Sequence, residues 1–458
     1  MNLAASTEAP LSQARAELLQ HKLVEYSDHV RPAQIPVQGR LIQMTGLTLV
    51  ASGCQAAIGN RCSIFASEGK EIEAEVVGFA NGNLYLMPIG RIKGLSPGAR
   101  VTPLQHYPEV GVGDELLGRV IDGNGSPIDR GGAIDYEKYV PLLGPPINPY
   151  ARKSIAKPLD VGVRSINSLL SIGQGQRMGL FAGSGVGKSV LLGQMTKNTD
   201  ADVVVVGLIG ERGREVREFV DNIFGPHKMS KAVVVATPAD DPPLMRLHGA
   251  WRATAIAEYF RDRGLNVLLL MDSLTRFAQA QRELALAIGE PPVTKGYPPS
   301  VFAQIPQLVE RAGTGATKNA GSITAFYTVL TEGDDQNDPI ADATRSILDG
   351  HIVLSRHLAD AGIYPAIAIE SSISRVMNSI IDEQHSQLAI RFKKLYSLYE
   401  QNRDLLTVGA YQAGSDPSVD EAIRYFPALQ EFIQQAAGDK ASYQESLNAL
   451  TTVLSQES

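Results

Sequence analysis

Residues 182–189 read AGSGVGKS, a glycine-rich loop whose residue types could bind the phosphates of a nucleotide. In such a loop the backbone amides converge on phosphate oxygens, Lys188 would reach the β and γ phosphates, and the Ser189 hydroxyl would bind Mg²⁺. Ala182 stands where the strict pattern has glycine, and a small residue still fits there. The alternative is a glycine-rich turn that happens to carry a lysine. The residues expected to contact the nucleotide are Gly183, Ser184, Gly185, Val186, Gly187, Lys188, Ser189 and Val190.

A carboxylate that could complete the Mg²⁺ site follows further along the chain. The run 266–271 reads as a buried strand and ends at Asp272. A strand ending in a carboxylate is the Walker B pattern, in which the Asp holds the Mg²⁺ shell. An Asp in this place can also be a helix cap. The metal interpretation gains weight because the strand follows a phosphate loop in a chain of βα units.

Glu211 belongs to a charged cluster, 207–215, that comes directly after the apolar strand 203–206. An open α/β sheet places its active site at the carboxyl ends of its strands. A carboxylate near the γ-phosphate can orient the attacking water, and Glu211 is the candidate for that role. A salt-bridged surface turn explains the same cluster equally well.

The segment 364–375 contributes an aromatic and a cation, Tyr364 and Arg375. Tyr364 could stack on a base or fill the core. An arginine after a strand is usually a surface or salt-bridge residue. An arginine finger, which stabilises charge during phosphoryl transfer, is the alternative role for Arg375, and it can come from a neighbouring subunit.

The composition is that of an ordinary globular protein of 458 residues, long enough for two or three domains. Its 42 basic and 49 acidic residues give a net charge of −7, which does not favour nucleic acid as the main partner. Cys54 and Cys62 are too few for a disulfide framework, so we expect two small core residues in a reducing compartment. The N-terminus lacks a signal sequence and no window reaches eighteen continuous apolar residues. A cytoplasmic protein with at most peripheral membrane contact is expected.

The elements that must position these residues fall into successive regions. Apolar residues near helical spacing predict a short amphipathic helix in residues 1–25. Short β-like runs separated by Gly, Asn and Pro predict a small β-barrel over 26–104. Buried strands alternating with helices predict a doubly wound parallel sheet over 105–385, with the phosphate loop between a strand at 177–181 and a helix at 188–195. Helical periodicity dominates 386–458, which is expected to form a C-terminal helical domain.

Several long motifs, in order, resemble the rotary-type ATPases related to the catalytic subunit of F-type ATP synthase. Within that superfamily the chain is similar to the flagellum-specific ATPases of bacterial type III protein export. The motifs that carry the resemblance are residues 179–189, 210–216, 271–280, 289–292, 295–302 and 332–335, the last reading EGDD. The resemblance covers about residues 30–435. It implies a barrel, a RecA-like nucleotide-binding domain and a helical domain in that order.

The resemblance also implies roles for single residues. Lys188 and Ser189 bind phosphate and Mg²⁺, Glu211 activates water, and Asp272 is the Walker B carboxylate. The remaining implied site residues are Arg212 near the γ-phosphate, Tyr364 against adenine, Tyr411 on the other side of the base, and Arg375 as a finger acting in trans. Because the loop lysine, Glu211 and the finger occur on one chain, identical subunits could form complete sites in a homohexameric ring.

The leading function is hydrolysis of Mg-ATP in flagellar protein export, at the cytoplasmic side of the inner-membrane export apparatus. The implied partners are a stalk-like regulator at the N-terminus, a central stalk protein, the export gate, and export chaperones and substrates. The nearest alternative is the ATPase of a virulence-type injectisome, whose relatives usually have a cysteine at the position of Val186. A nucleic-acid translocase would need a basic, aromatic strand-binding surface, and the β region is not conspicuously basic. A noncatalytic pump subunit is disfavoured by the presence of Lys188 and Glu211.

Overall fold

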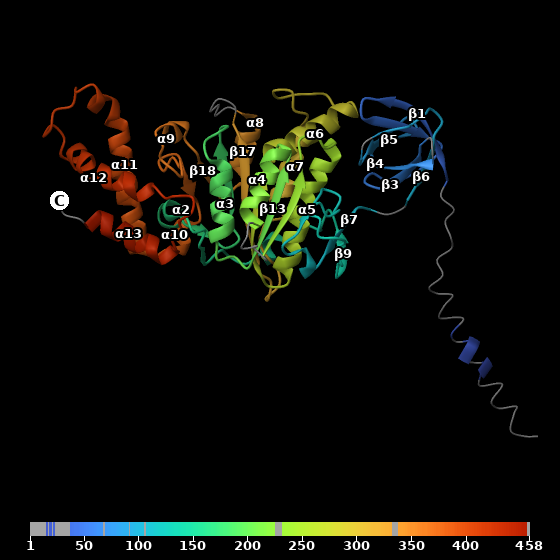
Figure 1. Cartoon of the computed structure of the whole chain (residues 1–458), viewed down its shortest axis with the longest axis horizontal. Coiled ribbons are helices and arrows are strands. Elements are labelled where there is room, and N and C mark those ends of the chain that lie inside the picture. The colour runs from blue at the N-terminus through green and yellow to red at the C-terminus, as the bar shows by residue number, and fades with distance from the viewer. Residues whose placement is uncertain are drawn as a thin grey trace, which may run out of the picture.

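The computed structural model describes residues 37–66, 69–90, 92–104, 107–224, 231–331 and 338–455, together with residues 15, 16, 18–20 and 22. Three parts follow one another along the long axis in Figure 1: a β-barrel, a sheet covered by helices, and a group of C-terminal helices. This is the expected order. The EGDD motif at 332–335 and most of the expected helix in residues 1–25 lie outside the described residues.

The barrel closes in the strand order β1-β2-β5-β4-β3-β6. Alternation creates its core: in β4 the side chains of Ile72, Ala74 and Val76 are buried between more exposed neighbours. Cys54 and Cys62 are free thiols buried in the same core, which confirms their predicted structural role. The strands are β1 (Gly39–Thr45), β2 (Thr48–Ser52), β3 (Arg61–Phe65), β4 (Glu71–Ala80), β5 (Asn83–Pro88) and β6 (Arg100–Pro103).

The central sheet has the order β19-β18-β12-β17-β15-β13-β14-β8 and is parallel from β18 to β8, with β19 antiparallel at one edge. β16 pairs with β17, and β7-β9 and β10-β11 form small antiparallel pairs. The strands are β7 (Glu109–Val112), β8 (Val120–Ile121), β9 (Lys138–Pro141), β10 (Pro158–Leu159), β11 (Ile172–Gly173), β12 (Arg177–Ala182), β13 (Val203–Ile209), β14 (Ala232–Thr237), β15 (Asn266–Asp272), β16 (Gly313–Thr314), β17 (Ser322–Leu330), β18 (Gly350–Val353) and β19 (Ile373–Ser374).

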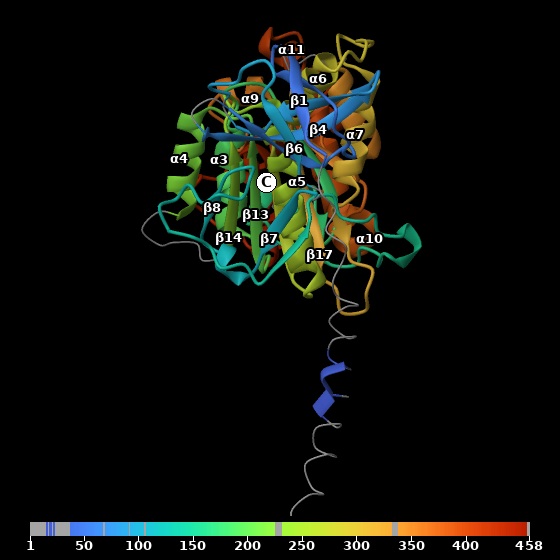
Figure 2. The same cartoon turned by 90° about the vertical axis from the view of Figure 1, so that its right-hand side faces the viewer.

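The sheet separates two hydrophobic clusters, because successive side chains of a strand point to opposite faces. In β13, Val204 and Val206 join the cluster that contains α3 and α4, whereas Val203 and Val205 join the cluster of α5, α6 and α7. Figure 2 shows α3 and α4 on one side of β13 and α7 on the other. The helices of this domain are α2 (Arg164–Leu169), α3 (Lys188–Asn198), α4 (Gly213–Phe224), α5 (Pro243–Asp262), α6 (Leu274–Ala287), α7 (Pro299–Val309), α8 (Pro339–Ile347), α9 (Arg356–Asp360) and α10 (Met377–Ile380), with short 3-10 turns at Asp114–Leu116 and Pro149–Ala151.

The C-terminal part consists of α11 (Glu383–Thr407), α12 (Pro417–Ile433) and α13 (Tyr443–Ser455). α11 begins three residues before the predicted boundary of 386, because the Asp382 carboxylate accepts the N–H of His385 at 2.8 Å and caps the helix there. This part contacts the nucleotide-binding domain through Gln435, whose backbone N–H donates to the Tyr364 carbonyl at 2.9 Å. The Gln435 side chain donates to the Gly162 carbonyl at the same distance.

No helix in the described part of the chain has both the length and the apolar character that crossing a bilayer requires.

Candidate nucleotide site

The glycine-rich loop joins the end of β12 at Ala182 to the start of α3 at Lys188, which is the predicted strand–loop–helix arrangement. Gly185 and Gly187 have φ angles of 79° and 92°, in the left-handed region that favours glycine. At Gly187 a Cβ would also come within 3.2 Å of the Tyr364 ring. Both the backbone conformation and the available space therefore require glycine at this position. The loop presents the N-terminus of α3, a favourable place for phosphate.

Lys188, Glu211 and Asp272 come together beside this loop. Lys188 Nζ lies 2.6 Å from Asp272 Oδ1 and 3.4 Å from Glu211 Oε1. The three side chains are 5–11% exposed. Their arrangement follows from the sheet: β12, β13 and β15 are parallel strands, so the residues at their carboxyl ends meet at one edge. The three predicted groups thus form one buried charge cluster.

The electrostatics of the cluster shift two pKa values. Burial, reinforced by the negative charge of Asp272, raises the pKa of Glu211 to about 7. Burial opposes the positive charge of Lys188, but the attraction of Asp272 and Glu211 outweighs it, and the pKa of Lys188 is raised. Glu211 is therefore poised to exchange a proton near neutral pH, whereas Lys188 stays charged. Such matching to the working pH is what a general base requires.

The oxygen donors around the loop fit Mg²⁺. The Ser189 hydroxyl and the Asp272 carboxylate are hard oxygen ligands, which this ion prefers. No cluster of three or more His, Cys, Asp or Glu side chains suited to a metal occurs within the described ranges. Mg²⁺ is commonly bound by one or two protein oxygens together with substrate phosphates, so a sparse donor set is the expected one. Ser189 and Asp272 would hold the ion.

Two residues at the site were missed in the sequence. The Thr328 hydroxyl donates to Asp272 Oδ1 at 2.6 Å, and Arg356 donates to the carbonyl of Ser184 in the phosphate loop at 3.1 Å. Thr328 lies near the carboxyl end of β17, which pairs in parallel with β15. In the sequence, a hydroxyl-bearing residue near the end of a buried strand was the signal that could have pointed to Thr328. Arg356 is 172 residues from its partner, and no local pattern pointed to it.

Tyr364 borders a cavity of about 440 Å³ between the nucleotide-binding domain and the C-terminal helices. The residue is 44% exposed, so it does not serve merely to fill the core. The lining residues are Arg164, Gly362, Tyr364, Glu431, Gln434, Gln435, Ala436 and Asp439. Tyr411 is not among them: its hydroxyl donates to the backbone carbonyl of Asp416 at 3.0 Å and to the carboxylate of Asp420, in the first turn of α12, at 2.9 Å.

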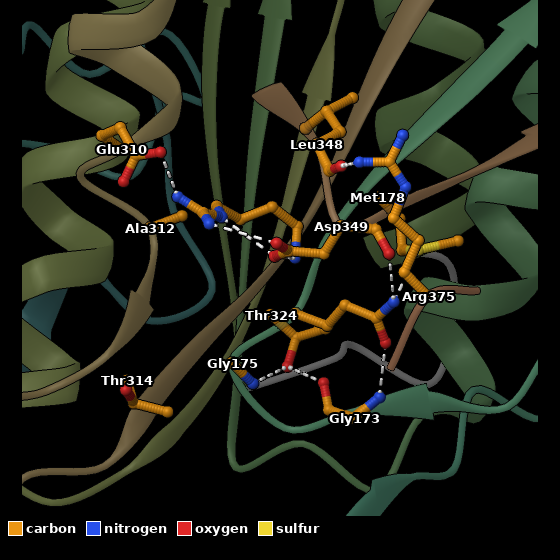
Figure 3. Close-up of polar contacts among 12 residues, drawn as sticks. Gly173, Gly175, Met178, Glu310, Ala312, Thr314, Thr324, Leu348, Asp349 and Arg375 are labelled. Atoms are coloured by element: carbon orange, nitrogen blue, oxygen red, sulfur yellow. Dashed lines mark hydrogen bonds and ion pairs between the residues drawn. The ribbon is translucent and has the colours of Figure 1, made fainter. Parts of the chain in front are cut away.

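Neither candidate arginine contacts the charge cluster of its own chain. The Arg212 side chain is 83% exposed and lies 3.7 Å from Glu215. Arg375 follows β19 at the sheet edge, where its guanidinium donates to the carbonyl of Leu348 at 3.2 Å (Figure 3). Arg375 is itself exposed. In this position Arg375 does not contact the Lys188 cluster of its own chain, and it is accessible to a neighbouring molecule.

Two family models match the domains described above. Residues 162–374 match the nucleotide-binding domain of the ATP synthase alpha/beta family, and residues 381–452 match the T3SS EscN ATPase C-terminal domain. The chain is 59% identical over 437 residues to the flagellum-specific ATP synthase of Pseudomonas aeruginosa, covering 94% of this chain and 97% of that protein.

Two solved structures of EscN from the type III secretion system of enteropathogenic E. coli are similar over most of the chain. The assembled ATPase EscN gives a TM-score of 0.86 at 44% identity, covering 91% of this chain and 100% of that chain. EscN in complex with its central stalk EscO gives a TM-score of 0.83 at 43% identity, with the same coverage.

Proposed function

Because the chain belongs to the ATP synthase alpha/beta family of P-loop ATPases, together with the flagellum-specific and type III secretion enzymes, we propose that it hydrolyses Mg-ATP in flagellar protein export. The observation that carries this proposal is the buried cluster of Lys188, Glu211 and Asp272 beside a phosphate loop. A lysine for phosphate, a carboxylate for water and a carboxylate for Mg²⁺ are the groups that hydrolysis of a nucleoside triphosphate needs.

Each group has a distinct role in the proposed reaction. Lys188 and the loop amides bind the β and γ phosphates. Glu211 orients a water molecule and accepts one of its protons as the water oxygen attacks the γ-phosphorus. The bond from that phosphorus to the β–γ bridging oxygen breaks, releasing ADP and phosphate. Ser189 and Asp272 would hold Mg²⁺, which would neutralise negative charge on the phosphates when bound. The raised pKa of Glu211 supports its part in this scheme, because a carboxylate of pKa about 7 is a stronger base than an ordinary one.

The adenine and finger assignments belong to the same proposal. Tyr364, which lies over Gly187, packs on the base within the cavity that it borders. Arg375 and Arg212 act on the γ-phosphate region, Arg375 from the neighbouring subunit. A finger that does not contact its own chain's cluster favours a closed ring of identical subunits with a site at every interface. The assembled form of the similar EscN supports a ring, for which six subunits are proposed.

The flagellar assignment is favoured over the injectisome assignment by two observations. The identity is 59% to the Pseudomonas flagellum-specific enzyme and 44% to EscN. Val186 also stands where the family resemblance leads us to expect a cysteine in an injectisome enzyme. We extend the proposal to a central stalk partner, on the model of EscN with EscO, and to a position at the cytoplasmic side of the export apparatus. A regulator at the N-terminus, the export gate, chaperones and export substrates complete the proposed partners.

Steady-state phosphate release from Mg-ATP, measured over a series of protein concentrations, tests the enzymatic proposal. Specific activity should rise with concentration as shared sites assemble, and Glu211→Gln should abolish it while binding of a fluorescent ATP analogue persists. Activity that is independent of concentration and survives Glu211→Gln would refute the proposed site. Complementation of export in a motile strain whose own flagellar ATPase is deleted separates the flagellar function from the injectisome alternative.

A further inference from the structure

The segment that carries Arg375 is fixed by the residues that lead into β18. β19 pairs with β18 at the edge of the sheet, and Arg375 follows β19 directly. The backbone N–H of Arg375 donates to the Asp349 carbonyl at 3.0 Å, and its guanidinium donates to the Leu348 carbonyl at 3.2 Å. Figure 3 shows Arg375 beside Leu348 and Asp349. Any shift of the Asp349 backbone would therefore move the arginine.

A buried amide, Gln176, joins the two sides of this contact. Its side chain is fully buried, and Nε2 donates to the Asp349 carbonyl at 3.1 Å and to Ser374 Oγ at 3.0 Å. Its Oε1 accepts the N–H of Gly173 at 2.8 Å. Gln176 thus links Ser374, the residue immediately before Arg375, to Asp349, whose carbonyl accepts the Arg375 N–H. A buried amide with all its partners present holds them rigidly, because breaking one leaves an unsatisfied polar group.

Asp349 is also fixed by Arg177, the first residue of β12. Its carboxylate accepts the backbone N–H of Arg177 at 3.0 Å, and also Nε and a terminal nitrogen of the Arg177 guanidinium, at 3.0 and 3.1 Å. The other terminal nitrogen of Arg177 lies 2.6 Å from Glu310. This bidentate pair leaves the Asp349 backbone little freedom.

Gln176 is remote from the phosphate loop of its own chain. β12 runs over six residues, so at about 3.3 Å per residue the loop begins about 20 Å from Gln176. The contacts of Gln176 therefore reach the arginine at one end of β12 and not the nucleotide at the other. A substitution of Gln176 should therefore impair catalysis at the nucleotide site on which Arg375 acts.

We propose that Gln176 is a positioning residue for Arg375, holding the arginine in the geometry in which it reaches the site of the neighbouring subunit. The proposal rests on the proposed role of Arg375 as a finger acting in trans. A group that stabilises transition-state charge must be placed to within a fraction of an ångström, and a misplacement of about 1 Å costs about 10²-fold in rate.

Gln176→Leu tests the proposal, with Thr324→Val as the matched control. Thr324 is also buried, and its hydroxyl accepts the N–H of Gly175, the residue before Gln176, at 2.8 Å. Its hydrogen bonds go to Gly173 and Gly175 and not to Ser374, Asp349 or Arg375. Gln176→Leu should lower kcat about 10²-fold with unchanged binding of a fluorescent ATP analogue. Thr324→Val should lose stability to a similar degree and keep its kcat. Equal kcat in both variants would overturn the proposal.

A mixture of Gln176→Leu with Glu211→Gln locates the defect. The first subunit keeps its own Glu211 and the second keeps a well-placed Arg375, so about a quarter of the interfaces in randomly mixed rings regain both groups. Recovery of activity well above either variant alone supports positioning in trans. No recovery means that Gln176→Leu damages its own site, which contradicts the proposal.

Two further variants keep the outcome decisive. If Gln176→Leu does not bind the ATP analogue because it fails to fold, Ser374→Ala replaces it, since this change removes the Gln176 contact at a partly exposed position. The same loss of kcat and the same recovery are expected. Arg375→Ala separates the two proposals: full activity in Arg375→Ala would refute the finger itself, whereas a dead Arg375→Ala with a normal Gln176→Leu would refute only the positioning role.

Discussion

Lys188 Nζ and Asp272 Oδ1 are 2.6 Å apart, in a site where the Lys188 side chain is 11% exposed and that of Asp272 is 5% exposed. The proposed phosphate-binding cation therefore also neutralises the proposed Mg²⁺ ligand. A buried pair of this kind contributes little relative to apolar residues, but removing one partner leaves an uncompensated charge. The cluster thus has a structural consequence that can be measured independently of catalysis.

Lys188→Ala should lower the free energy of unfolding by about 3 kcal/mol, because Asp272 and Glu211 are left facing each other without a cation. The loss should be larger at pH 8 than at pH 6, since Glu211 is mostly protonated at pH 6. Urea unfolding at the two pH values measures it. Arg214→Ala, which breaks an exposed ion pair with Glu218, is the control and should cost nothing measurable. Equal stability of Lys188→Ala and wild type at pH 8 would contradict the burial of this cluster.

Turnover should rise as the pH increases from 6 to 8, because Glu211, with a pKa of about 7, must be ionised to act on water. Stability should change in the opposite direction. The folded protein binds an extra proton between the ordinary value of 4.5 and about 7, so the contribution of Glu211 to stability is lost as the pH rises through that window. Glu211→Gln should remove this slope. A pH profile of stability identical in wild type and Glu211→Gln would show that the pKa of Glu211 is not raised.

Thr328→Val should weaken the site without changing its shape, since the Asp272 carboxylate loses a hydroxyl donor at 2.6 Å. A hydrogen bond to a charged group is worth about 2 kcal/mol, and we expect a loss of that order in unfolding free energy. Asp272 should also hold Mg²⁺ less well, so the Mg²⁺ concentration giving half-maximal binding of a fluorescent ATP analogue should increase. Thr328→Ser restores the hydroxyl and should recover both properties. A valine variant with unaltered stability and Mg²⁺ dependence would show that this contact is dispensable.

Much of the site could be predicted because its signals are local. The strand at 266–272 and the start of α3 at Lys188 are where the apolar runs and glycines indicated. β13 was predicted too short, ending at 206, because Gly207 interrupts the valine run. In the fold β13 continues to Ile209, and Gly207 gives the room that Met271 occupies, since a Cβ there would lie 2.8 Å from its Sδ.

Contacts between distant segments could not be read in the same way. Thr328 reaches Asp272 only because β17 and β15 are neighbours, and the order of strands is not visible in either segment. The Gln176 contacts likewise depend on β18 lying beside β12. Tyr411 was assigned through a loose match in the connection between α11 and α12, where helical periodicity gives no register. Its assignment to the base stays a prediction, and the structure places it against Asp420.

Mixing Glu211→Gln with Arg375→Ala tests the central claim most directly, that one chain supplies the water-activating carboxylate and its neighbour the arginine. Each variant alone should bind the ATP analogue and show no turnover. On equimolar mixing, about a quarter of the interfaces in a ring should contain both intact groups, and Mg-ATPase activity should return to a corresponding fraction of wild type. Failure to recover any activity, with both variants assembled and nucleotide-bound, would contradict shared sites and place the whole reaction within a single chain.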